Sequence, residues 1–183
     1  MEYAAACIIG YLLGSVPVAL LVARRHGVDL YATADGNPGA WNALQQLGAR
    51  RAWPAFAGDA LKGTVAGAAG VALGGTWAGY AAVAAAMLGH AYPLLGRLRG
   101  GKSVMTFAGG MLAVAPLAAA IALAVCVAIA LAARSFAWGA RAGVLSFPLV
   151  QLAVEPVSHV AATGALMTII GVRFLTAPRR ATA

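Results

Sequence analysis

Side chains that could do chemistry gather in three short stretches of an otherwise apolar chain. These are "DGNPGAWN" at Asp35–Asn42, "DALKG" at Asp59–Gly63 and "GRLRGGKS" at Gly96–Ser103. In the first and third stretches, glycines come before a segment with helical character. Such a turn can present backbone N–H groups to an anion. The residue types therefore indicate recognition of a phosphate-like group.

The first stretch has the composition of a turn that leads into a helix. Glycine and asparagine tolerate positive φ, and Pro38 fits a turn or the first turn of a helix. The pattern predicts a short helix from Ala40 that ends at Gly48. Taken alone, this signal is equally satisfied by a re-entrant turn that only caps the helix.

The stretch at Gly96–Ser103 adds a lysine at the junction with the next apolar segment. Gly100 and Gly101 would let a phosphate approach the backbone, Lys102 adds a point charge, and Ser103 offers a hydroxyl or an N-cap. The alternative is a basic anchor at a membrane surface. That alternative explains the arginines but not the paired glycines.

The middle stretch places two ionisable residues inside a hydrophobic span. Asp59 and Lys62 are three residues apart, so they share a helix face and can pair. An ionisable residue in a span costs about 2.5–3.5 kcal/mol on insertion scales, so it tends to be paired or functional. A structural pair and a site pair remain equally open. His90, close in sequence to the last stretch, is by itself more typical of a structural histidine.

The bulk composition indicates a polytopic, all-α membrane protein. Of 183 residues, 62% are hydrophobic and 10% are charged, and the mean hydropathy is +0.83. Soluble domains carry about 25% charged residues. We expect one integral membrane domain over residues 1–183 with about seven hydrophobic helices. The apolar segments are Ala4–Ala23, Trp53–Leu73, Trp77–Leu95, Ser103–Val114, Pro116–Ala133, Ala142–Val154 and Ser158–Val172.

The positive charges predict the orientation. Twelve of the thirteen Lys and Arg residues fall in alternate connections, and Lys62 is the exception. The positive-inside rule then puts the N-terminus outside and the C-terminus in the cytoplasm, as a multi-pass protein of the inner (plasma) membrane. This needs a helix break between Gly109 and Pro116. The fourth, sixth and seventh segments are short, which is typical of re-entrant helices that line a cavity.

Several function classes are disfavoured by the same observations. The net charge of +8 is explained by orientation, so we expect no nucleic-acid partner. Cys7 and Cys126 both lie in apolar runs, and no metal-type Cys/His spacing occurs. We therefore expect neither a metal nor another cofactor.

Five motifs in this order resemble the PlsY family of membrane acyl-phosphate:glycerol-3-phosphate acyltransferases. They are "GYLLGSVP", "GNPGAWN", "DALKG", "GHAYP" and "LRGGKSVMT", and together they cover Gly10 to Gly110. The resemblance implies a seven-helix bundle with a cytoplasmic active site. It also implies transfer of an acyl group from acyl phosphate to the 1-hydroxyl of glycerol 3-phosphate, giving lysophosphatidic acid.

The resemblance also implies roles for individual residues, although it names no catalytic one. Two phosphate-facing loops would be shaped by the substrate-binding residues Gly36, Asn37, Gly39, Asn42, Gly100, Gly101, Lys102 and Ser103. Asp35, Asp59, Lys62 and His90 would support these loops. The implied partners are membrane lipids, acyl phosphate, glycerol 3-phosphate or a similar acceptor, and another membrane protein if the chain acts as a subunit.

The chain departs from the family pattern at informative positions. Asp35 stands where the family has serine, Gln45 where it has arginine, and Ser103 where it has glycine. The C-terminal half keeps little of the pattern. A carboxylate inside the site would weaken phosphate binding. If Asp35 pairs with Arg99 or Lys102 instead, it occupies the place of the anion.

Three hypotheses follow. The chain is an active acyltransferase of this family, with the same or an altered acceptor. Alternatively, it is a relative without activity that serves as a lipid-binding or scaffold subunit beside another envelope enzyme. The third hypothesis is a small transporter or channel, which the short helices and the Asp59–Lys62 pair allow.

Overall fold

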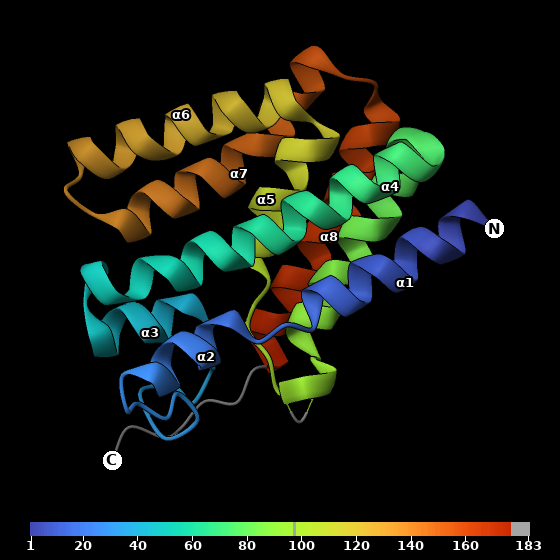
Figure 1. Ribbon diagram of the computed structural model, residues 1–183. Coiled ribbons are helices and arrows are strands. Elements are labelled where there is room, and N and C mark those ends of the chain that lie inside the picture. Colours follow the sequence, from blue (N-terminus) through green and yellow to red (C-terminus); the bar gives the residue numbers. More distant parts are fainter. Residues whose placement is uncertain (97, 177–183) are drawn as a thin grey trace.

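The computed structural model describes residues 1–96 and 98–176, and these residues form a helical bundle without strands (Figure 1). A single 3-10 turn, Leu94–Gly96, follows α4. The α-helices are α1 (Glu2–Gly14), α2 (Val18–Arg25), α3 (Ala40–Leu47), α4 (Ala49–Ala91), α5 (Val104–Val114), α6 (Pro116–Ala132), α7 (Phe136–Val154) and α8 (Val157–Thr176).

The helices confirm the predicted membrane class. Within the described residues, four helical stretches are long and apolar enough to cross a membrane: Glu2–Arg25, Ala49–Gly96, Phe136–Val154 and Val157–Thr176. The second of these contains two predicted segments, because α4 is broken by non-helical backbone at Gly74 and Gly75. Two shorter apolar helices, α5 and α6, meet at Ala115, where the expected break occurs.

Two expectations about helix length were wrong. The sixth and seventh segments are not short, since α7 has 19 residues and α8 has 20. Arg141 lies inside α7, because the helix begins at Phe136 with Ser135 as its N-cap, and the Arg141 guanidinium lies 5.0 Å from the centre of the Trp138 ring. Arg173 does not end α8, because its charge is held inside the protein by carbonyl groups.

The first segment is also not one continuous helix. It is interrupted at residues 15–17, and α2 starts at Val18. At 1.5 Å per residue, the 13 residues of α1 rise about 20 Å, which is less than the roughly 30 Å of a hydrocarbon core. The candidate span Glu2–Arg25 therefore includes the interruption, and irregular backbone within a span needs protein partners.

Glycines let the helices approach each other closely. A Cβ on Gly10 or Gly14 of α1 would collide with carbonyl groups of α4, and a Cβ on Gly63 of α4 would collide with the carbonyl of Thr106. Close approach through small residues is a main source of helix association in membranes. The bundle core is apolar, with Phe107 and Phe147 packed edge to face at 5.6 Å.

The two ends of the bundle differ in chemistry. Figure 1 shows α2, α3, the segment after α4 and the end of α8 at one end, and the N-terminus and the turn of α4 at the other. Most described basic residues outside Lys62 belong to the segments at the first end or to the start of α4: Arg24, Arg25, Arg50, Arg51, Arg99, Lys102 and Arg173. Arg134 and Arg141 belong to the region where α6 leads into α7, and this region contacts α3 through the stacked rings of Phe136 and Trp41. Arg97, Arg179 and Arg180 lie outside the described residues.

Candidate functional site

The two glycine-containing loops that the sequence analysis singled out lie side by side. Lys102 Nζ lies 3.0 Å from Asp35 Oδ2, and a Cβ built on Gly39 would lie 3.8 Å from Gly101 Cα. The Tyr31 hydroxyl spans the same gap, because it lies 2.9 Å from the Gly96 carbonyl oxygen and 3.0 Å from that of Arg99. The loops therefore form one surface, as a shared anion site requires.

The first loop is anchored by a buried leucine and braced by a buried asparagine. Leu30 is fully buried among α2, α3 and the start of α4. The side-chain amide of Asn42 donates to the carbonyl groups of Leu30, Thr33 and Asn37. Gly36 has a φ of 71°, where glycine avoids strain. Asn42 thus holds the shape of the loop, and its amide group points into the loop itself.

Asn37 is the residue of this loop with an unused acceptor. Its side chain is buried, and its Oδ1 atom has no hydrogen-bond partner within the described part of the chain. Leaving such an atom unpaired costs about 1–3 kcal/mol. A ligand hydroxyl or a water molecule would relieve that cost, so Asn37 Oδ1 is a candidate contact for a polar ligand.

The second loop uses its glycines differently from the expectation. The Gly100 N–H donates to the Ala91 carbonyl at 3.0 Å, and the Gly101 N–H donates to the His90 carbonyl at 3.2 Å. These N–H groups are therefore bound to the end of α4. The glycines are needed for close packing, because a Cβ on Gly100 would meet the His90 carbonyl and a Cβ on Gly101 would meet the His90 ring.

Ser103 also faces inward. It is buried, has a φ of 62°, and its hydroxyl donates to the Met87 carbonyl at 2.7 Å. It occupies the N-cap position of α5 without a side-chain cap. The charged group that this loop directs toward its neighbour is Lys102, whose Nζ lies near Asp35 and 4.8 Å from the centre of the Phe174 ring.

Arg173 is a site residue that the sequence analysis missed. Its Nη2 donates to the Gly100 carbonyl at 2.9 Å, its Nε donates to the Gly101 carbonyl at 3.2 Å, and it lies over the Tyr92 ring at 4.9 Å. The sequence places it directly after the seventh apolar segment, Ser158–Val172, as one of the basic residues that predict the orientation. The signal that could have found it is its position inside an apolar helix instead of after one.

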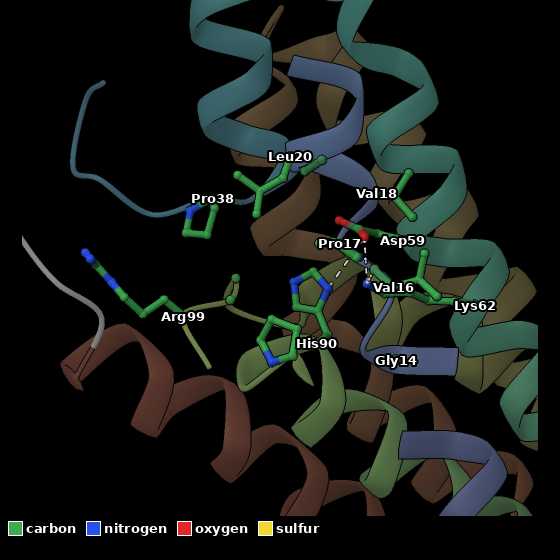
Figure 2. A pocket seen from close by; sticks show the side chains of 14 residues that line it. Gly14, Val16, Pro17, Val18, Leu20, Pro38, Asp59, Lys62, His90 and Arg99 are labelled. Carbon is green, nitrogen blue, oxygen red and sulfur yellow. Dashed lines mark hydrogen bonds and ion pairs between the residues drawn. The ribbon is translucent and has the colours of Figure 1, made fainter. Parts of the chain in front are cut away.

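A charged cluster lies deeper in the bundle (Figure 2). Asp59 Oδ1 lies 2.9 Å from Lys62 Nζ and 3.5 Å from His90 Nδ1, and all three side chains are buried. Lys62 Nζ also donates to the Val16 carbonyl at 3.0 Å, in the interruption between α1 and α2. Asp59 Oδ1 receives no hydrogen bond of good geometry, so its interaction with the Lys62 ammonium is mainly electrostatic.

Two neighbouring hollows lie between this inner cluster and the loops. The inner crevice is lined by the cluster, by the α1–α2 interruption and by Pro38, Arg99 and Gly100, and its volume of about 10 Å³ suits about one water molecule. The outer pocket has about 150 Å³ and is lined by Gly36, Pro38, Leu98, Arg99, Gly100, Arg173 and Thr176. Pro38, Arg99 and Gly100 line both hollows.

The charge around the outer pocket is positive. Arg99 and Arg173 line the pocket, and Lys102 lies beside it with Asp35 as its partner. Gln45, on the exposed face of α3, lines neither hollow. No group of three or more potential metal ligands occurs among the described residues. The arrangement is thus suited to a small anion with polar substituents.

Comparison with known proteins gives consistent matches. The family model described as glycerol-3-phosphate acyltransferase matches residues 4–183. A glycerol-3-phosphate acyltransferase of Geobacillus sp. (strain WCH70) is 39% identical over 117 residues, which are 63% of this chain and 59% of that protein. One from Bacillus cytotoxicus is 39% identical over 115 residues, 62% of this chain and 58% of that protein. These alignments span less than two thirds of the relatives' own lengths.

Solved structures match over a longer range. The crystal structure of PlsY (YgiH), an integral membrane glycerol 3-phosphate acyltransferase, in its glycerol 3-phosphate form has a TM-score of 0.84 and 28% identity. The lysophosphatidic acid form has a TM-score of 0.80 at the same identity. Both matches cover 100% of this chain and 96% of the solved chain.

Proposed function

The chain belongs to the glycerol-3-phosphate acyltransferase family, and from this premise we propose that it acylates glycerol 3-phosphate in phospholipid synthesis. The acyl donor is an acyl phosphate, and the products are lysophosphatidic acid and inorganic phosphate. The observation that carries the proposal is the meeting of two polar loops at one small pocket, which Arg99 and Arg173 line and which the Lys102–Asp35 pair adjoins. A lipid-binding subunit and a transporter gain no support from these relatives.

The reaction requires a site for phosphate groups. Both substrates carry one, so cations and hydrogen-bond donors must be present, and three basic side chains surround or adjoin the outer pocket. Its volume of about 150 Å³ is below the 300–1,000 Å³ of sites for drug-sized ligands, which favours a small polar acceptor. The anhydride of an acyl phosphate is already activated, so no covalent enzyme intermediate is needed.

We assign roles within the predicted site on the basis of these contacts. Lys102 and Arg99 bind phosphate oxygens, and Asn37 Oδ1 accepts a hydrogen bond from an acceptor hydroxyl. Loop shape depends on Gly36, Gly39, Asn42, Gly100, Gly101 and Ser103. The buried Asp59, Lys62 and His90 fix the inner crevice, and Arg173 positions the second loop.

The membrane setting follows from the same charge distribution. The basic end of the bundle would face the cytoplasm, with the N-terminus outside and the protein in the bacterial inner (plasma) membrane. The site then opens toward soluble glycerol 3-phosphate. The apolar helices on either side leave the acyl chain in contact with lipid.

Acyl transfer by the purified full-length chain tests this function. With acyl phosphate and glycerol 3-phosphate, we expect lysophosphatidic acid and an equal amount of released phosphate. Lys102→Ala should lower kcat/KM by about a hundredfold, since a charge-assisted contact to phosphate is lost. Arg141→Ala is the control, because this arginine stacks on Trp138 and lines neither hollow.

A negative result would be informative. Absence of turnover with any acyl donor, together with failure to replace a missing acyl-phosphate acyltransferase in living cells, would contradict the proposal. Equal losses in Lys102→Ala and Arg141→Ala would contradict the assigned role of Lys102.

A further inference from the structure

Asp35 is held in the way that proteins hold an anionic ligand. Its Oδ2 atom lies 3.0 Å from Lys102 Nζ, and its Oδ1 atom accepts the backbone N–H of Asn37 at 3.1 Å. An ammonium group and a backbone N–H in a glycine-containing turn are also the usual partners of a phosphate oxygen. The carboxylate therefore makes the contacts that an incoming phosphate would need.

The pair also lies next to residues that line the two hollows, because Asp35 precedes Gly36 and Lys102 follows Gly101. Gly36, the next residue after Asp35, lines the outer pocket together with Arg99 and Arg173. The pair remains accessible to water, because the Asp35 side chain is 39% exposed and that of Lys102 is 24% exposed. A partly exposed pair between two loops can separate without leaving a charge buried.

We propose that Asp35 is an internal competitor for the phosphate site, and that phosphomonoester ligands bind by displacing its carboxylate from Lys102. Asp35 then determines the affinity of this site, because every ligand must first replace an anion that is already there. The inference rests on the proposed function only in taking the ligand to be phosphate-bearing.

The chain offers a matched pair of variants. Asp35→Asn removes the negative charge and keeps a side-chain oxygen that can accept the Asn37 N–H. Asp29→Asn makes the same change of charge in the same loop, where Asp29 Oδ1 accepts the Tyr31 N–H at 2.9 Å. Asp29 is exposed and has no ion-pair partner within the described residues, so it controls for general charge effects.

The test is calorimetric binding of glycerol 3-phosphate and of inorganic phosphate to the purified full-length chain at fixed low ionic strength. We expect Asp35→Asn to lower both dissociation constants by about tenfold, the order expected when a nearby like charge is removed. Asp29→Asn should change them by less than about twofold, since solvent and salt screen its charge. In the acyl-transfer assay, Asp35→Asn should lower the KM for glycerol 3-phosphate more than it changes kcat.

Three outcomes would overturn the inference: unchanged binding in Asp35→Asn, weakened binding in Asp35→Asn, or the same gain in Asp29→Asn. The first two would make Asp35 a tether between the loops, and thermal unfolding of the variant checks that it is folded. The binding readout needs no turnover. Tighter ligand binding in Asp35→Asn without any acyl transfer by the protein would contradict the proposed function alone. Acyl transfer by the protein with unchanged ligand affinity in Asp35→Asn would contradict this inference alone.

Discussion

The inner and outer ion pairs of the site have the same chemistry but different surroundings. Lys62 and Asp59 are 2.9 Å apart with side chains only 6% and 2% exposed, whereas Lys102 and Asp35 are 3.0 Å apart and 24% and 39% exposed. The inner pair lies within one helix, and the outer pair joins two loops. The same contact distance can therefore belong to a fixed framework in one place and to an exchangeable contact in another.

The reason for the difference is the cost of separation. A buried charge that loses its partner cannot recover its hydration, whereas a partly exposed charge can. His90 and the Val16 carbonyl further tie the inner pair to the rest of the bundle. We therefore expect stability to depend on the inner cluster, and ligand affinity to depend on the outer pair.

The largest effect should come from breaking the inner pair. Asp59→Ala leaves Lys62 buried without its counter-charge and should cost about 3–5 kcal/mol of stability. Thermal unfolding in detergent measures this loss. Asp59→Leu combined with Lys62→Met removes both charges and should recover a large part of it. A loss below about 1 kcal/mol in Asp59→Ala would mean that the inner pair is as exchangeable as the outer one.

An intermediate effect is expected at the point where the second loop is held. Arg173→Ala removes two charge-assisted hydrogen bonds to the Gly100 and Gly101 carbonyls, which should cost about 2–3 kcal/mol. The free energy of unfolding should fall and the KM for glycerol 3-phosphate should rise. Arg173→Lys should show smaller changes in both quantities. Arg141→Ala, which removes an arginine that lies over the Trp138 ring and lines neither hollow, should leave both near wild type. An unchanged KM in a destabilised Arg173→Ala would separate loop position from ligand binding.

The smallest effect should come from the outer pair. Asp35→Asn should change the free energy of unfolding by less than about 1 kcal/mol, because solvent replaces what the partly exposed pair loses. The same unfolding assay checks this value against Asp59→Ala. If the two variants were equally destabilised, the contrast between the pairs would disappear.

Much of the fold could be predicted from hydropathy and charge. The turn near Gly74, the break at Ala115 and the all-helical class are confirmed by the structure. The lengths of α7 and α8 were underestimated, because Arg141 and Arg173 were treated as helix ends. Arg141 lies over the ring of Trp138 within the same helix, whereas Arg173 is bound by the Gly100 and Gly101 carbonyl groups, which come from a distant part of the chain.

The site was harder to predict than the fold. The family motifs predict that the two loops and the Asp59–Lys62–His90 set belong to one site. The sequence leaves open whether Asp35 points into that site or pairs with Arg99 or Lys102. The use of the Gly100 and Gly101 N–H groups could not be predicted, because their partners are carbonyl groups at the end of α4. Local sequence reveals which groups a loop can offer, but not which of them the bundle has already bound.

The interruption between α1 and α2 has a consequence for assembly. The Val16 carbonyl accepts the Val18 N–H and the Lys62 ammonium. Val16 and Lys62 both belong to candidate membrane spans, and hydrocarbon offers such groups no partner. If the segment Glu2–Arg25 were inserted alone, its polar backbone at Val16 would lack the Lys62 partner. If the segment Ala49–Gly96 were inserted alone, Lys62 would lack the Val16 carbonyl. The first segment supplies a carbonyl acceptor and the second supplies the ammonium donor, so the two segments are suited to enter the bilayer together.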